Sequence, residues 1–188
     1  FTSFSPGQSL GNINDLLDVC VNFEHSYMGD LVISLTCPTG QSVLLHQQGG
    51  GGTNLGDPDQ AGGAQFPGVG WDYCWSPTAT NGTWDDNSAT STMTNSSGSM
   101  SLIPGTYESI NTMNALVGCD LNGTWEIEFC DLWGSDDGFV FSWEINFDPS
   151  LFPPLTSFTP GIGAQQDSSS WSGPNILSGS GDGNEITV

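Results

Sequence analysis

The chain has 188 residues, of which 36% are hydrophobic, enough for one domain with a sizeable core and an appendage. It contains 21 Asp and Glu residues and neither Lys nor Arg, so its formal charge at pH 7 is −21. Such a polyanion is repelled by nucleic acid and by anionic lipid. No stretch approaches the ~20 apolar residues of a membrane span. The sequence therefore predicts no nucleic-acid partner and no direct membrane insertion.

The clearest structural pattern lies in residues 18–45. Polar and apolar side chains alternate over residues 18–25 and again over 30–37, which is the period of a half-buried strand. Turn residues at 26–29 and 38–40 reverse the chain after each run, so we expect a β-meander. With its many Gly, Ser, Thr and Asn residues, the composition favours an all-β fold of short strands and long loops.

Two later segments predict the rest of the sheets. Residues 125–129 and 139–145 place their large apolar side chains at every second position, and we expect these to face the core. The members of these two sets are Trp125, Ile127 and Phe129, and Phe139, Phe141, Trp143 and Ile145. After residue 148 the composition becomes proline-rich, so we predict a sandwich over 1–148, a linker over 149–169 and a short strand-forming tail over 170–188.

Residues 25–45, HSYMGDLVISLTCPTGQSVLL, resemble the P domain (P/homo B domain) of proprotein convertases and of many secreted bacterial proteins. The resemblance rests on a His-x-Tyr-x-Gly-Asp-Leu hairpin followed by a Pro-x-Gly turn. Residues 122–131 and 138–145 resemble the second half of the same domain, so that together the motifs cover roughly residues 8–148. The tail at 170–188 resembles the incomplete start of an Ig-like or PKD-like module.

The resemblance implies a jelly-roll-like β-sandwich and a non-catalytic module of a large secreted or cell-surface protein, similar to the adhesin-like surface proteins of Bacteroidetes-type bacteria. Its partners would be neighbouring domains of the same polypeptide or other surface proteins. The motifs of a subtilisin-like catalytic domain are not in the sequence, and His25 and His46 are its two near-neutral bases. His25 is on the apolar-facing register, which favours a buried structural histidine. We therefore predict that the chain is not an enzyme.

Five cysteines stand at positions 20, 37, 74, 119 and 130 without the spacing of a metal site. In a turn-rich acidic domain, this favours disulfides and an oxidising compartment, hence an extracellular or cell-surface location. The first pairing that we consider is Cys20 with Cys37 and Cys74 with Cys119. The alternative pairs Cys20 with Cys130.

Acidic side chains in loops suggest a calcium site, because carboxylates brought together without basic residues need a cation, a proton or hydrogen bonds. The loop at 131–138 offers three candidates, the Gly-Asp-Leu motif one, and the glycine-rich segment after residue 46 another. These candidate ligands are Asp131, Asp136, Asp137, Asp30 and Asp57. The alternative is that Asp30 and Asp131 cap turns through nearby backbone amides.

Two further functions remain open. Trp71, Tyr73 and Trp75 alternate with polar residues, so an extended chain would present one aromatic face. Such a face could stack on sugar rings and make the chain a carbohydrate-binding module, although the same spacing is also typical of a core strand. The third hypothesis is an extracellular assembly in which the tail at 170–188 adds a strand to the next copy.

Overall fold

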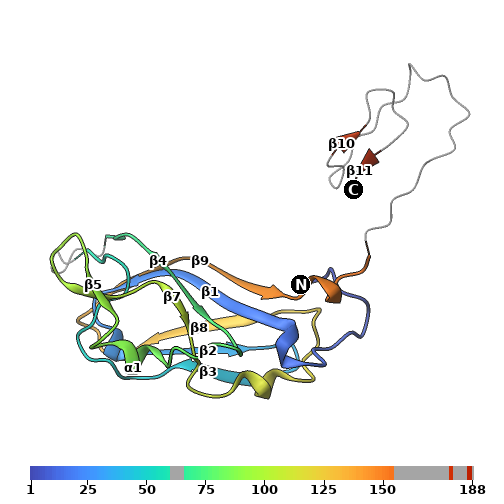
Figure 1. The fold of residues 1–188 in the computed structure, drawn as a ribbon, viewed down its shortest axis with the longest axis horizontal. Coiled ribbons are helices and arrows are strands. Elements are labelled where there is room, and N and C mark those ends of the chain that lie inside the picture. The colour runs from blue at the N-terminus through green and yellow to red at the C-terminus, as the bar shows by residue number, and fades with distance from the viewer. Residues whose placement is uncertain (60–65, 155–177, 180–185, 188) are drawn as a thin grey trace, which may run out of the picture. The chain divides into compact units, whose positions relative to one another are not determined.

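The computed structural model describes residues 1–59, 66–154, 178–179 and 186–187, and the chain divides into two compact units, Phe1–Phe152 and Pro153–Val188. The first unit is an all-β sandwich of two facing sheets, which confirms the predicted fold class (Figure 1). In the second unit, the described strands are β10 (Ser178–Gly179) and β11 (Ile186–Thr187), which pair antiparallel.

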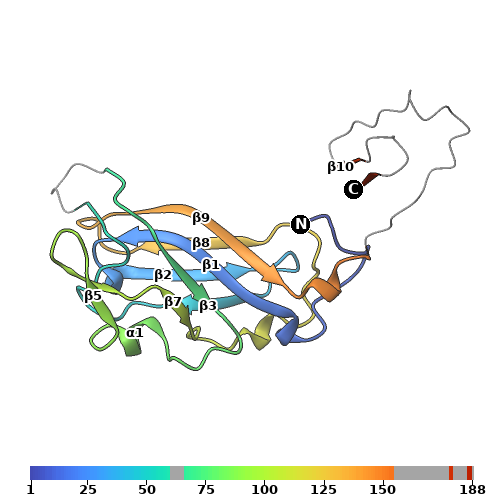
Figure 2. The same ribbon diagram turned by 45° about the horizontal axis from the view of Figure 1, so that its top comes forward.

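Four strands form the first sheet, in the order β7-β4-β1-β9, and three form the second, in the order β3-β2-β8 (Figure 2). The first sheet consists of β1 (Leu16–His25), β4 (Trp71–Trp75), β7 (Gly105–Tyr107) and β9 (Gly138–Phe147). The second consists of β2 (Leu31–Thr36), β3 (Ser42–His46) and β8 (Glu126–Asp131). All neighbours are antiparallel except β4 and β7.

Short elements connect these strands. A separate two-stranded ribbon pairs β5 (Thr92–Thr94) with β6 (Met100–Leu102), and α1 (Trp84–Asn87) is a single helical turn. The 3-10 turns are η1 (Ile13–Asp15), η2 (Met28–Asp30), η3 (Met113–Leu116) and η4 (Pro149–Leu151).

The core lies between the two sheets. β1 and β2 each bury every second side chain over most of their length, as their alternation predicts, and these include Val19, Val21, Phe23, Leu31, Ile33 and Leu35. The rings of Phe23 on β1 and Phe129 on β8 lie 5.2 Å apart across the interior. Each fully buried aliphatic or aromatic side chain contributes about 1.5–3 kcal/mol.

The predicted β-meander over residues 18–45 is wrong in its first half. β1 and β2 do not pair; they lie in opposite sheets, and the chain crosses between the sheets at η2, where Met28 is buried. Alternation reports which face of a strand is buried, but two strands that bury the same core can either lie side by side or face each other. The β2–β3 hairpin does form, around the Pro38–Gly40 turn.

Trp84 fills the space between the sheets on the β4 side. Thr83 caps α1 and forms a capping box with Asp86, which turns the Trp84 ring inward. The ring stacks on Trp75 at 4.6 Å and lies 5.0 Å from His46 of the opposite sheet. Trp84 therefore joins the two sheets.

The opposite side of the sandwich is open. β9 and β8 are edge strands, and Phe141 and Trp143, expected in the core, are both exposed. The register shift between Asn22 and Phe23 of β1 leaves Phe141 without a partner on β1. Trp143 pairs with Val21 on the same side of the shift as Ile145, so its exposure reflects its place on an edge strand. Ile145, beyond the shift, is buried as predicted.

Residues 149–152, assigned to the linker from the sequence, pack on the sandwich. The Phe152 ring stacks on Phe4 at 4.6 Å, and the Gln8 side-chain amide donates to the Leu151 carbonyl at 2.9 Å. Residues 155–169 of that predicted linker lie outside the described residues, as does the predicted tail apart from β10 and β11.

Two disulfides form among the four predicted cysteines, but with neither predicted connectivity: Cys20 bonds Cys74 and Cys37 bonds Cys119. Cys20 and Cys74 are directly opposite each other on β1 and β4, with Cα atoms 4.0 Å apart. The first pairing fails because β1 and β2 are not neighbours. The alternative fails because Cys130 is free and lies on β8, in the other sheet.

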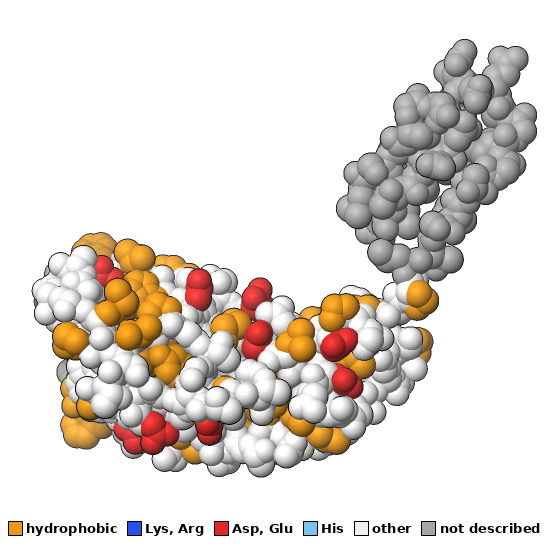
Figure 3. Space-filling view, in the orientation of Figure 1, with side chains coloured by type: hydrophobic (Ala, Val, Ile, Leu, Met, Phe, Trp, Pro, Cys, Tyr) orange, Lys and Arg blue, Asp and Glu red, His pale blue; other side chains and the backbone are white. Residues whose placement is uncertain are grey.

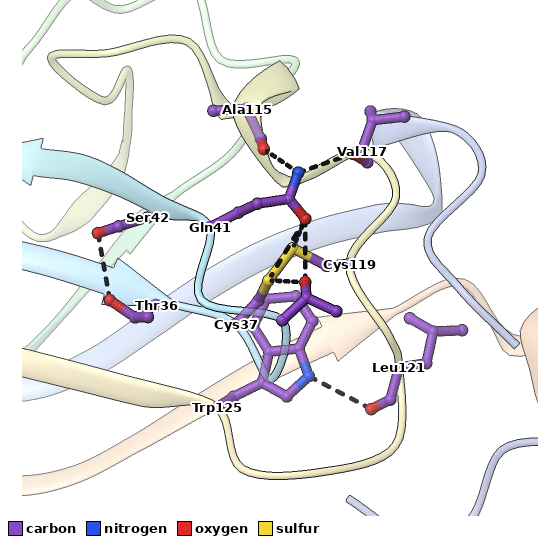
Figure 4. The surroundings of a disulfide bond; sticks show 10 residues. Thr36, Cys37, Gln41, Ser42, Ala115, Val117, Cys119, Leu121 and Trp125 are labelled. Atoms are coloured by element: carbon purple, nitrogen blue, oxygen red, sulfur yellow. Dashed lines mark hydrogen bonds between the residues drawn. A yellow bond between two sulfur atoms is a disulfide. The ribbon is translucent and has the colours of Figure 1, made fainter. Parts of the chain in front are cut away.

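The Cys37–Cys119 bond fixes the β2–β3 turn to the segment after η3. Beside it, the Gln41 amide donates to the carbonyl oxygens of Ala115 and Val117, each at 3.1 Å (Figure 4). The Trp125 indole donates to the Leu121 carbonyl at 3.3 Å in the same region. One covalent bond and three hydrogen bonds thus hold this end of the sandwich.

Removing the second disulfide with Cys37→Ala and Cys119→Ala is expected to lower the free energy of unfolding by about 2–5 kcal/mol, because the unfolded chain loses a constraint on a loop closed across 82 residues. Urea denaturation measures the loss. Cys130→Ser, which removes a thiol outside both disulfides, serves as the control and should leave the midpoint nearly unchanged. Equal stabilities for the double variant and this control would contradict the assigned connectivity.

Candidate functional site

Three segments meet at a pocket of about 590 Å³ on the first unit: η2, the glycine-rich segment after β3, and the β8–β9 loop. Tyr27 and Trp133 provide its aromatic lining, and Asp30 and Asp136 its carboxylates. The rest of the lining includes backbone of Gly49 and Gly51. The volume lies within the range of small-ligand sites.

The glycine-rich segment is held against η2 by backbone hydrogen bonds. The Gly29 amide donates to the Gly51 carbonyl at 3.0 Å, and the Met28 amide to the Thr53 carbonyl at 2.9 Å. Gly50 has a φ of +82°, and a Cβ there would lie 2.0 Å from Met28 Cε. The positive φ favours glycine at this position, where the segment forms one wall of the pocket.

The β8–β9 loop forms the opposite wall. Asp131 Oδ1 accepts a hydrogen bond from the Trp133 amide at 3.0 Å, and the Ser26 amide donates to the Asp137 carbonyl at 3.0 Å. These bonds hold both ends of the loop while the Trp133 side chain stays 63% exposed. The turn-capping role considered for Asp131 is therefore present.

Three of the five predicted calcium ligands come together at this pocket. Asp30 is 9% exposed, and its pKa is raised, first by burial and then by the negative charges of Asp136 and Asp131. A hydrogen bond with Asp136 raises the pKa further, since such a bond requires a proton on one of the two carboxyls. The acidic group of Asp30, Asp131 and Asp136 thus carries unfavourable negative charge.

His25 lies behind this acidic group and is buried, as its strand register predicts. Its Nδ1 accepts a hydrogen bond from the Tyr27 amide at 3.1 Å, which places the ring proton of the neutral imidazole on Nε2. Nε2 is 3.5 Å from Asp131 Oδ2 and has no hydrogen-bond partner. His25 Nε2 therefore faces Asp131 of the acidic group without forming a hydrogen bond to it.

The other two predicted ligands, Asp57 and Asp137, lie near Glu24, which the sequence did not single out. Glu24 is 1% exposed, and burial raises its pKa to about 7, with further increases from Asp137, Asp59 and Asp57. A hydrogen bond from the Gly68 amide at 3.3 Å acts in the opposite direction. Strand alternation puts Glu24 on the outer face of β1, but the residue 55–57 segment pairs beside it and covers that face.

Within the described residues, no three His, Cys, Asp or Glu side chains are arranged to hold a metal ion. The predicted ligands instead divide between the acidic group at the pocket and the surroundings of Glu24. Carboxylate and carbonyl oxygens are the ligands that calcium prefers, so the donor types at the pocket fit this ion. Calcium binding stays a prediction.

The aromatic platform predicted from Trp71, Tyr73 and Trp75 is wrong. Tyr73 and Trp75 are 0% exposed, because β4 lies inside the four-stranded sheet and turns them toward the core. The Tyr73 hydroxyl donates to the Leu102 carbonyl at 2.9 Å and accepts from the Gly56 amide at 2.8 Å. These side chains therefore build the core and anchor the loops, and they offer no face to a sugar.

The second histidine, His46, is also buried in the interior of the sandwich. His46 is buried, and burial lowers its pKa to about 4. Its Nε2 lies 3.2 Å from the Met28 carbonyl oxygen, to which the neutral ring can donate a hydrogen bond.

Among the described residues, no helix has the length and apolar character needed to cross a membrane.

The pKa shifts of Glu24 and His46 predict opposite contributions to stability over the same mildly acidic range. Glu24 binds its proton more tightly in the folded state, so stability falls as pH rises from 4.5 to about 7. His46 resists protonation in the folded state, so stability falls as pH drops from 6.5 to about 4. Glu24→Gln should remove the first loss and raise the melting temperature near pH ~8 much more than near pH ~4.

The matched control for that measurement is Glu126→Gln, which removes the same charge from an exposed position at the start of β8. Thermal melts of both variants and the parent across the pH range separate local burial from net charge. A pH profile of Glu24→Gln that parallels that of Glu126→Gln would show that the Glu24 carboxyl is not perturbed by burial.

Comparison with known proteins finds a family model that matches part of the chain. The family model of the proprotein convertase P-domain matches residues 15–85, which run from η1 into α1 and include β1, η2, β2, β3 and β4. No curated protein and no solved structure matches the chain. The matched region contains the His-x-Tyr-x-Gly-Asp-Leu motif, whose Tyr27 and Asp30 line the pocket. Residues 15–85 of this β-sandwich are thus similar to the proprotein convertase P-domain.

Proposed function

We propose that the chain is a non-catalytic, P-domain-like module of a large secreted or cell-surface adhesin-like protein, and that it acts as a rigid spacer and interaction domain. The observation that carries the proposal is the P-domain match over residues 15–85, because that family is an accessory domain without catalytic residues of its own. The two disulfides add support for an oxidising, extracellular environment.

The rigidity of the module follows from how its parts are tied together. The disulfides close loops across 54 and 82 residues, and Trp84 packs against both sheets. Since long closed loops restrict the unfolded chain most, these bonds favour the folded spacer. Loops attached to such a frame can present contacts to neighbouring domains or surface proteins without reorganising it.

We further propose that calcium stabilises the module at the acidic group of Asp30, Asp131 and Asp136. Burial raises the pKa of Asp30, and the negative charges of Asp136 and Asp131 raise it further in a chain without Lys or Arg. A divalent cation bound between these side chains would compensate their negative charge. Carbonyl oxygens of the neighbouring loops and water would complete the six to eight ligands that calcium takes.

Assembly by strand addition is a second candidate, and the open edge favours it. β9 is ten residues long, and among the described strands it pairs with β1 alone. Its side chains Val140, Phe141 and Trp143 are exposed. An unpaired strand edge with apolar side chains is a template for a strand from another chain. The predicted tail at 170–188 would supply that strand to the next copy.

Calcium should raise the melting temperature of the chain above its value in excess chelator, because a ligand that binds only the folded state stabilises it by mass action, by about 2.7 kcal/mol at a hundredfold excess over the dissociation constant. Asp136→Asn should abolish most of this shift. Asp57→Asn, at a carboxylate that instead accepts from the Ser96 amide, should retain it. Identical melts of the parent chain in calcium and in chelator would reject calcium stabilisation.

Strand addition predicts concentration-dependent association that disappears when residues 170–188 are deleted. Sedimentation velocity of the full and shortened chains over a wide concentration range measures it. A full chain that stays monomeric throughout, or a shortened chain that associates equally well, would remove this candidate.

A further inference from the structure

The pocket beside η2 has an aromatic side chain on each of two walls. Trp133 extends from the β8–β9 loop and is 63% exposed. Tyr27 lies against the glycine-rich segment, with its ring 3.2 Å from the position of a Cβ on Gly52. The electron-rich faces of Trp and Tyr attract cations, with Trp the stronger of the two. These rings belong to separate segments and meet at one cavity of about 590 Å³.

Negative charge lines the same cavity. Asp30 and Asp136 both line it, and Asp131 lies close enough to raise the pKa of Asp30. The chain contains no Lys or Arg, so no ammonium or guanidinium side chain of its own can neutralise them (Figure 3). The charge at this site calls for a cation from outside the chain.

A buried histidine gives an independent indication that the polar groups here are incompletely satisfied within the chain. His25 Nε2 points toward Asp131 Oδ2 at 3.5 Å, is buried, and has no hydrogen-bond partner. Buried polar atoms are almost always hydrogen-bonded in folded proteins. His25 Nε2 is one of five such atoms among the described residues, and it is the one that lies beside Asp131.

We propose that this pocket binds the guanidinium group of an arginine side chain on a partner polypeptide. A guanidinium is planar, always charged and weakly hydrated; it stacks on an aromatic face while its N–H groups donate to carboxylates. Trp133 supplies the face, and Asp30 and Asp136 supply the acceptors. The inference deepens the proposed role as an interaction domain and rests on it, since it names the chemistry of the partner.

A neutral sugar is the competing ligand, because aromatic rings with carboxylates also suit hydroxyl groups. Sugar binding would leave the charges of Asp30, Asp131 and Asp136 uncompensated, whereas a guanidinium compensates them directly. The charge therefore favours the cation, and a panel of methyl glycosides provides the contrasting arm of the test.

The experiment titrates the ¹⁵N-labelled 188-residue chain with acetyl-Gly-Arg-Gly-amide, which carries one guanidinium and no terminal charge. Chelator is present, so that the outcome is independent of calcium binding. The amide signals of Gly49, Gly51 and Ser135, which line the pocket, serve as reporters. We expect a saturable shift with the arginine peptide, weaker binding of the lysine peptide, and no binding of the isosteric citrulline peptide.

Variants locate the interaction. Trp133→Ala and Asp136→Asn should each weaken binding about threefold to tenfold, through loss of the ring face or of a charge partner. Glu126→Gln removes one charge at the opposite end of β8 and should leave the affinity unchanged. Added salt should weaken the arginine complex, as for any exposed charge pair.

The inference is overturned if the reporters do not move, if the citrulline peptide binds as well as the arginine peptide, or if methyl glycosides bind in place of both. None of these results depends on whether calcium raises the melting temperature. A failure of the arginine site can therefore be told apart from a failure of the calcium proposal.

Discussion

The absence of Lys and Arg constrains the whole molecule, because no carboxylate can be neutralised by an ammonium or guanidinium group of the same chain. The fold meets this constraint in several ways. Many acidic side chains are dispersed over the surface, where water screens them (Figure 3). Others accept local hydrogen bonds that lower their pKa, as Asp86 does from Thr83 and Asp148 from Ser150. At Glu24 and Asp30, burial raises the pKa instead, so a proton or an external cation replaces the missing basic partner.

Stability in such a chain has to come from packing and covalent bonds. The two sheets bury their facing side chains, and Trp84 reaches across from one sheet to the other. The disulfides fix β1 to β4 and the β2–β3 turn to the segment after η3. The closely packed apolar interior is therefore distinct from the loops where Asp30, Asp131 and Asp136 lie close together.

Much of the fold was predictable from local pattern, because alternation reveals which side of a strand faces the core. Alternation predicted the inward residues of β1 and β2 and the burial of His25. The sequence motif around Asp30 indicated the similarity to the P-domain. It could not show that β1 and β2 lie in opposite sheets, and both disulfide predictions failed for that reason. At the site, the clustering of Asp30 with Asp131 and Asp136 depends on contacts between segments about a hundred residues apart, which no local pattern encodes. Glu24 was missed because a loop covers a face that alternation assigns to solvent.

The central claim is that carboxyl groups at the rim of this sandwich are neutralised by protons or by external cations. Side-chain carboxyl ¹³C NMR across the acidic and neutral pH range, in chelator, tests it most directly. The account predicts that Glu24 titrates near pH 7 and that Asp30 titrates above the usual range of an aspartate, apart from the dispersed surface carboxylates. If Glu24 and Asp30 instead titrated at the ordinary pKa values of the surface carboxylates, burial and neighbouring charge would not perturb them. That result would contradict the account.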